Sequence, residues 1–142
     1  MKHTALVLLL VLGSSVVLAG GRWKIAVEHQ GNDNNGTIFV AELMEKLNQS
    51  SFFYLVSVQK ANIVLKIHTL DVGEGGQIPR GVITTYAVAF VVKSGDSISI
   101  FGDMWLGYSG TAHISSAADV VYARTLAGAQ VLGEKWAVDS AE

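Results

Sequence analysis

The sequence predicts an α+β fold, a two-layer sandwich in which two helices cover one face of a mixed sheet. Three observations lead to this fold class. Residues 61–100 contain β-rich runs of alternating apolar and polar residues, separated by a glycine-rich loop and a turn, as in an antiparallel meander. One amphipathic helical pattern precedes this region and another follows it. No segment is repeated, so the predicted order is β-α-β-β-β-β-α.

The first strand and the first helix come before the meander. Residues 22–28 alternate between apolar and charged side chains, which indicates a strand with one face in water. The polar residues 30–36 form a loop, and we expect Thr37 to cap a helix over 37–49. At 3.6 residues per turn, the apolar side of this helix comprises Phe39, Val40, Leu43, Met44 and Leu47.

Four further strands are expected, over 51–58, 61–72, 81–93 and 97–106. Gly107 and Gly110 break the last strand, and Ser116 with Asp119 resembles a capping box for a final helix that ends near Ala137. The apolar arc of that helix comprises Ala118, Val121, Tyr122, Thr125, Ala129, Leu132 and Trp136. We expect the core to include Leu43, Leu47, Leu65, Ile67, Phe90, Val121 and Leu132.

The first nineteen residues have the pattern of a secretory signal. Lys2 starts it with a positive charge, residues 5–12 are an unbroken apolar run, and Ala19 is small, as the cleavage position requires. We therefore expect a signal peptide over 1–19 and one α+β domain over 20–142, exported to the periplasm or secreted. An uncleaved anchor is the alternative. The apolar run is shorter than the about 20 residues that a membrane span needs, which argues against this anchor. We expect no stable membrane span after cleavage.

The amino-acid composition limits the possible covalent links, the compartment and the partners of the protein. The chain has no cysteine, which rules out disulfides and a lipid anchor on an amino-terminal cysteine. This composition suits a bacterial envelope better than an animal secreted domain of the same size. Twelve acidic residues outnumber ten basic ones, and no basic run is present. We therefore expect no binding of nucleic acid.

Two sets of polar residues are candidates for chemistry. We expect neither a metal nor another cofactor, because no metal-ligand spacing is formed by the histidines His29, His68 and His113. Ser109 lies in a segment that fails the nucleophile-elbow pattern at its last position, Thr111, and we interpret this segment as a connector with a helix cap. The alternative is a small secreted hydrolase that uses Ser109, His113 and Asp103. That alternative requires Ser109 Oγ to lie within about 2.6–3.2 Å of a histidine nitrogen.

The segment after the first loop resembles a unit of exported bacterial proteins. A helix with Leu43 and Leu47 is followed by a serine pair, by Phe53 and, after a strand, by Ala61-Asn62. This order resembles the amino-terminal domain of the Tol-system periplasmic protein and envelope-assembly domains of the curli-secretion type, with asparagine in place of the usual acidic residue. The resemblance implies a binding or scaffolding module rather than an enzyme, and it assigns no binding residue. We therefore interpret the chain as a non-enzymatic binding or assembly module of the bacterial cell envelope.

The strand over 81–93 is apolar on both faces, which predicts that the sheet face without helices is also covered. We expect the helices to pack on Ile63, Leu65, Ile67, Ile98, Ile100 and Met104. The other face then carries Lys66, Ala87, Ala89, Ser99 and Asp103, together with four candidate binding residues, His68, Thr85, Phe101 and Trp105.

No further element of the chain is expected to cover that second face. Phe101 and Trp105 would therefore be aromatic anchors for a protein partner, for a second copy of this chain in a homo-oligomer, or for a ligand. The alternative is a half-wet sheet with two exposed aromatic side chains.

Overall fold

The structure is a computed structural model that describes residues 22–75, 77–94 and 98–139; the signal peptide predicted over 1–19 lies outside them. Within these residues the predicted order of strands and helices is confirmed. The elements are β1 (Trp23–Gln30), α1 (Asn34–Gln49), β2 (Phe53–Leu55), β3 (Ile63–Asp71), β4 (Ile83–Ser94), β5 (Ile98–Gly110) and α2 (Ile114–Asp139). Short 3-10 turns lie in three connections, η1 (Val58–Lys60), η2 (Val72–Gly75) and η3 (Thr111–His113).

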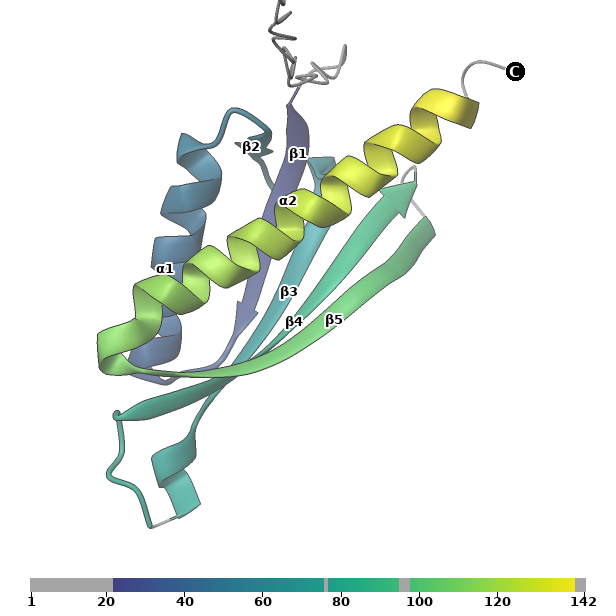
Figure 1. Ribbon diagram of the computed structural model, residues 1–142. Coiled ribbons are helices and arrows are strands. Elements are labelled where there is room, and N and C mark those ends of the chain that lie inside the picture. Colours follow the sequence, from purple (N-terminus) through teal and green to yellow (C-terminus); the bar gives the residue numbers. More distant parts are fainter. Residues whose placement is uncertain (1–21, 76, 95–97, 140–142) are drawn as a thin grey trace, which may run out of the picture.

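The strands form one mixed sheet in the order β2-β1-β3-β4-β5. Strand β1 pairs in parallel with both β2 and β3, whereas β3, β4 and β5 pair antiparallel, which confirms the predicted meander. Both helices lie on the same face of this sheet, so the predicted two-layer α+β fold is confirmed (Figure 1).

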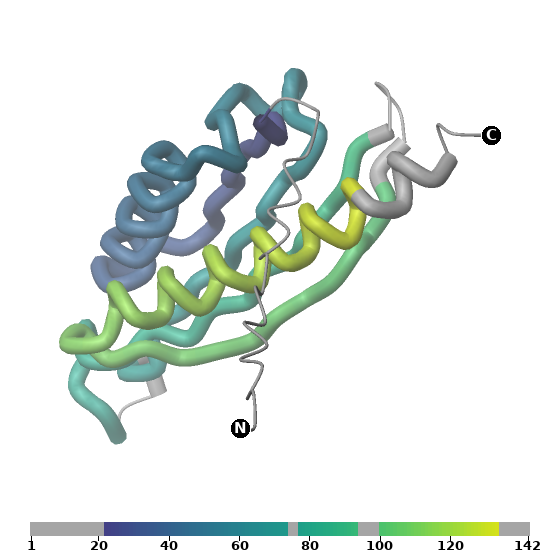
Figure 2. The backbone as a smooth tube through the Cα atoms, turned by 45° about the horizontal axis from the view of Figure 1, so that its top comes forward, coloured from purple at the N-terminus to yellow at the C-terminus, as the bar shows by residue number. Residues whose placement is uncertain are grey.

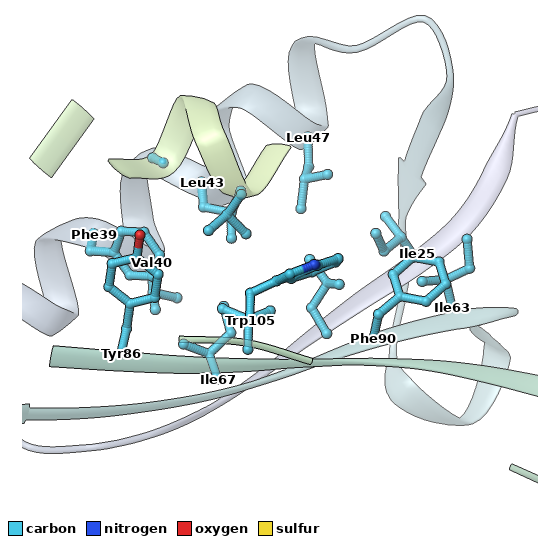
Figure 3. Packing of buried hydrophobic residues seen from close by; sticks show 14 of the residues in the cluster. Ile25, Phe39, Val40, Leu43, Leu47, Ile63, Ile67, Tyr86, Phe90 and Trp105 are labelled. Carbon is cyan, nitrogen blue, oxygen red and sulfur yellow. The ribbon is translucent and has the colours of Figure 1, made fainter. Parts of the chain in front are cut away.

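The core lies between the helices and the sheet. Figure 3 shows Phe39, Leu43 and Leu47 of α1 above the side chains of Ile25, Ile63 and Ile67. Six of the seven predicted core residues are buried, namely Leu43, Leu47, Leu65, Ile67, Phe90 and Val121. The seventh, Leu132, is half-buried against the same cluster.

Helix α1 begins three residues earlier than predicted, because Asp33 rather than Thr37 is its N-cap. Oδ2 of Asp33 accepts a hydrogen bond from the backbone N–H of Gly36 at 2.7 Å. A short carboxylate can reach the free N–H groups of a first turn, and its charge interacts favourably with the helix dipole there. Of the predicted apolar side of the helix, Met44 is 40 % exposed and the other four residues are buried.

The ends of β2 and β5 also differ from the prediction. Strand β2 is confined to the three residues that pair with β1, and the chain then turns into η1. Strand β5 continues through Gly110, because residues 107–110 keep their pairing with β4. A Cβ atom at Gly107 would lie 2.4 Å from Cζ of Tyr86, the residue opposite. Gly107 therefore permits close packing within the strand and does not end it.

Helix α2 begins at Ile114, directly after η3, so the predicted capping box of Ser116 and Asp119 is wrong. Asp119 instead forms an ion pair with Lys46 Nζ at 2.7 Å, and this pair joins α2 to α1, which lies beside it (Figure 2). On the predicted apolar arc, Tyr122 and Leu132 are half-buried, and the fully buried residues are Ala118, Val121, Thr125 and Ala129. The side chains of Trp136, Ile98 and Ser99 lie outside the described part of the chain.

Candidate binding surface

The sheet face opposite the helices carries residues of β3, β4 and β5 in regular rows. Directly opposed residues of antiparallel strands share a face of the sheet. The register gives three such rows, Lys66–Ala89–Met104, His68–Ala87–Leu106 and Leu70–Thr85–Tyr108. We call these nine residues the open face.

Four of the nine side chains of the open face are large, apolar and exposed. Leu70, Met104, Leu106 and Tyr108 are 58, 54, 76 and 78 % exposed, respectively. Between the β3 side and the β5 side, β4 contributes a floor of half-buried Ala87, Ala89 and Thr85. Several large apolar side chains exposed together on one face are uncommon in monomeric proteins and typical of an interaction surface. The open face is therefore the strongest candidate for binding.

The remainder of this sheet face is covered by the chain itself. The connection from β2 to β3 brings Val56 and Val58 against Ala26 and Val64. Lys93 Nζ donates to the carbonyl oxygen of Val58 at 3.0 Å, which fastens the connection to β4. The expectation that no element would cover the second face is therefore wrong on β1 and the start of β3. It holds for the three rows of the open face.

Trp105 lies on the helix side of the sheet, contrary to the prediction. Only 7 % of this residue is exposed, and its ring meets the edge of Phe90 with the ring centroids 6.1 Å apart (Figure 3). Its Nε1–H donates to Asp103 Oδ2 at 3.0 Å. Trp105 is thus a core residue and no anchor of the open face.

A β-bulge explains the reversed facing of Trp105. Asp103 pairs with Phe90 and Phe101 pairs with Val91, so Gly102 is an extra residue on β5. Because side chains alternate between the two faces of a strand, one inserted residue exchanges the faces of all later ones. The same shift moves Met104, which was expected beneath the helices, to the open face.

The structure separates the other predicted binding residues. His68 is exposed on the open face, and Thr85 is half-buried there, with its Oγ1 donating to the carbonyl oxygen of Leu70 at 3.3 Å. Phe101 is 61 % exposed at the bulge, outside the three rows. Strict alternation could not identify Leu106 and Tyr108, because their facing depends on the bulge.

A second apolar surface lies on the helix side, between α2 and the adjacent ends of β4 and β5. It is a cavity of about 710 Å³, lined by Phe90, Val92, Ile100, Phe101, Gly102, Asp103, Trp105, Arg124, Ala127, Gly128, Val131 and Leu132. Its volume falls in the range of small-ligand sites. The carboxylate of Asp103 is already bonded to Met104 N and Trp105 Nε1. Arg124 is the other charged residue of this lining, and no described hydrogen bond or ion pair engages its side chain.

A buried polar network lies where β1 leads into α1. Thr69 Oγ1 donates to Asp33 Oδ1 at 2.6 Å, and His29 Nε2 lies 2.9 Å from the same hydroxyl oxygen. Burial by itself raises the pKa of Asp33, but hydrogen bonds from the Thr69 hydroxyl and from the N–H of Gly36 outweigh it and hold the pKa below its usual range. Asp33 is therefore ionised at neutral pH.

The charge of Asp33 fixes the direction of the hydrogen bonds in this network. The Thr69 hydroxyl must give its proton to the carboxylate, so His29 Nε2–H donates to Thr69 and does not act as its base. A Cβ at Gly31, which has φ of 151°, or at Gly36 would come within 2.2 Å of Thr69 Oγ1. The network therefore holds the loop between β1 and α1 tightly against β3.

The alternative hydrolase triad is not assembled. Asp103 and Ser109 lie on one extended strand, and their six-residue separation corresponds to about 20 Å. Ser109 is buried, and its Oγ donates to the carbonyl oxygen of Gly110 at 3.1 Å. His113 is exposed in η3, and no described hydrogen bond joins it to Ser109. The geometry therefore gives no support to a Ser-His-Asp mechanism.

Neither a metal site nor a membrane span is formed by the residues described. In 22–75, 77–94 and 98–139, no three histidine, aspartate or glutamate side chains gather closely enough to hold a metal ion. Over the same ranges, no helix combines the length and the apolar character needed to cross a bilayer.

No protein-family model and no curated protein matches the chain. Solved structures show distant likeness. The hypothetical protein CT253 from Chlamydia trachomatis has 12% identity and a TM-score of 0.41 over 62% of this chain and 71% of that one. Protein XCC0632 from Xanthomonas campestris, described as DUF330, has 8% identity and a TM-score of 0.42 over 85% of this chain and 89% of that one. PelC from Paraburkholderia phytofirmans, solved as a dodecamer, has 17% identity and a TM-score of 0.39 over 76% of this chain and 88% of that one. Likeness at this level assigns no function, and the Tol- and curli-type resemblance stays a prediction.

Proposed function

We propose that this chain is a non-enzymatic binding or assembly module of the bacterial cell envelope that holds a partner protein on its open face. The observation that carries the proposal is the group of apolar side chains Leu70, Met104, Leu106 and Tyr108, each more than half exposed around a floor of small residues. Covering such side chains gains about 25 cal/mol for each Å² of apolar surface removed from water. A partner would therefore be held mainly by apolar contact.

The charges at the border of the open face indicate how such a partner is oriented. Lys66 forms an ion pair with Glu28 of the neighbouring strand at 3.3 Å, and both side chains are about half exposed. His68 follows two positions along the same strand. Lys66 and His68 of β3 thus offer polar groups to the rim of an interface, while Leu70 of the same strand and the β5 side are apolar. This arrangement matches an apolar core with a polar rim.

The location in the envelope rests on the sequence. Residues 1–19 have the pattern of an export signal, and the absence of cysteine suits a bacterial envelope better than an animal secreted domain of this size. We place the domain in the periplasm or outside the cell on this basis. Because the sequence has no basic run and more acidic than basic residues, we propose no nucleic acid as a partner.

The test compares two substitutions of matched chemistry. Leu70→Glu puts a charge on the open face, and Val120→Glu puts the same charge on the exposed side of α2, where the side chain is 50 % exposed. Chemical cross-linking in intact cells, followed by mass spectrometry of the purified chain, should recover one defined partner with the wild type and with Val120→Glu. Recovery should fall at least about tenfold with Leu70→Glu, at an unchanged melting temperature. Equal recovery from all three chains would contradict the proposal.

A further inference from the structure

Strand β5 lies at one edge of the sheet, and the hydrogen bonds to β4 determine which of its backbone groups point outward. The N–H of Thr111 donates to the carbonyl oxygen of Val82 at 3.2 Å, one step beyond the pair Gly110–Ile83. In an antiparallel pair, residues that exchange backbone hydrogen bonds alternate with residues that do not. Ser109, Gly107 and Trp105 therefore bond to β4, and the residues between them direct their N–H and C=O groups to the free edge.

One independent hydrogen bond supports this assignment. The N–H of Met104, which should point to the free edge, is bonded there by Asp103 Oδ1 at 2.7 Å. Beyond Met104, the free edge presents the backbone of Leu106, Tyr108 and Gly110. In the described part of the chain, no group bonds to the backbone of Leu106 or Tyr108 at this edge. The same two residues carry the most exposed large apolar side chains of the open face.

This edge lacks the usual protection against pairing. Natural sheets block exposed edges with lysine, proline, inward charges or very short strands. Strand β5 has thirteen residues and contains neither lysine, arginine nor proline. Its single charged residue, Asp103, occupies one N–H next to the bulge, and the stretch from Leu106 to Gly110 is neutral. The backbone groups of Leu106 and Tyr108 remain open there, and the carbonyl oxygen of Gly110, which accepts from Ser109 Oγ at 3.1 Å, keeps a second lone pair.

We propose that β5 pairs with β5 of a second copy of this chain, antiparallel across a two-fold axis at Tyr108. The Asp103 bond to Met104 ends the free stretch on one side and η3 ends it on the other, so Tyr108 is its midpoint. Tyr108 then faces Tyr108 of the second copy, Leu106 faces Gly110, and Gly107 faces Ser109. The three exposed residues of each copy can exchange up to about six backbone hydrogen bonds.

The side chains of this stretch fit a second copy of the same strand. On the helix side the opposed residues are the small Gly107 and Ser109, so no bulky side chain has to enter the space beside α2. On the open face each Leu106 lies next to a glycine and diagonally beside a tyrosine ring. The contact is neutral, so two copies of a chain with a net charge of −2 meet there without facing like charges.

The absence of cysteine allows this register to be measured with single thiols. Opposed residues that exchange hydrogen bonds have Cα atoms about 5.5 Å apart, which suits a disulfide. Tyr108→Cys should therefore cross-link two copies under mild oxidation. Leu106→Cys and Met104→Cys place the thiols about 13 and 26 Å apart along the strand, and should cross-link at least about tenfold less. Cross-linking of Tyr108→Cys no stronger than that of Met104→Cys would overturn the proposal.

A charge exchange gives the second, independent measurement. Tyr108→Lys and Tyr108→Glu each place like charges opposite one another across the axis, so each alone should lower the dimer fraction seen by native mass spectrometry or sedimentation. An equimolar mixture should restore the dimer as a mixed species, and Leu70→Glu on β3 should leave the dimer unchanged. Leu70→Glu thus tests binding of the partner protein, and the Tyr108 substitutions test the dimer separately. A wild type that stays monomeric up to millimolar concentration, or a mixture that stays monomeric, would overturn the pairing.

Discussion

A single side chain, that of Asp33, joins the start of helix α1 to the sheet. It caps α1 through Gly36 N, accepts from the Thr69 hydroxyl, and so ties the first loop to β3. Nothing in the local sequence distinguishes it from the other polar residues of that loop, and Thr37 is a plausible cap by pattern alone. Asp33 is the N-cap because the hydroxyl of Thr69, 36 positions later on β3, donates a hydrogen bond to its carboxylate.

The lowered pKa of Asp33 predicts a pH dependence of stability. The unfolded carboxyl has a pKa of about 3.9, and the folded one lies below it. The ionised group therefore contributes stability that is fully present above pH 4 and is lost as the pH falls through the folded pKa. Asp33→Asn keeps one acceptor and cannot titrate. We expect it to be about 1–2 kcal/mol less stable at pH 7.

The measurement is urea unfolding of both chains between pH 7 and pH 2. The free energy of unfolding of the wild type should approach that of Asp33→Asn as the pH falls below 4, because only the wild type loses the charge. A gap that stays constant down to pH 2 would show that Asp33 is not stabilised as the anion.

Along the apolar side of helix α1, exposure changes sharply between two residues that lie one turn apart. Leu47 is fully buried against the sheet and Met44, one turn earlier, is 40 % exposed. Emptying a packed leucine site costs the transfer free energy of the side chain plus a term for the cavity that remains. Leu47→Ala should therefore lower the free energy of unfolding by about 2–5 kcal/mol.

Met44→Ala is the matched control on the same helix, and it should cost less than about 1 kcal/mol, because much of that side chain is already in water. Chemical denaturation followed by circular dichroism gives both values. Equal losses for the two substitutions would mean that the helix presents a different side to the sheet.

For the whole molecule, we expect export of the domain with removal of residues 1–19. The pattern of residues 1–19 predicts cleavage after Ala19, so the mature protein should begin at Gly20. Intact-mass measurement of the chain recovered from the cell envelope and from the medium checks this directly. Recovery of the full chain from Met1, in membrane fractions, would instead identify the first segment as an anchor.

The types of element, their order and most of the core can be predicted from the amino-acid sequence. Helical and strand periodicities depend on residues a few positions apart, so they can be recognised without knowing what packs where. Leu43 and Leu47 on α1, and Leu65 and Ile67 on β3, were predicted from such local patterns and are buried. The antiparallel meander followed from strands separated only by short loops.

Three features could be seen only in the three-dimensional structure: which side of β5 faces the helices, where α1 begins, and what covers the far side of the sheet. Each depends on partners far away in the chain. The extra residue at Gly102 has meaning only against the register of β4, and it moves Trp105 into the core and Met104, Leu106 and Tyr108 to the open face. Periodicity counts positions along one strand, whereas facing is set by pairing between strands, so the candidate surface became visible only in three dimensions.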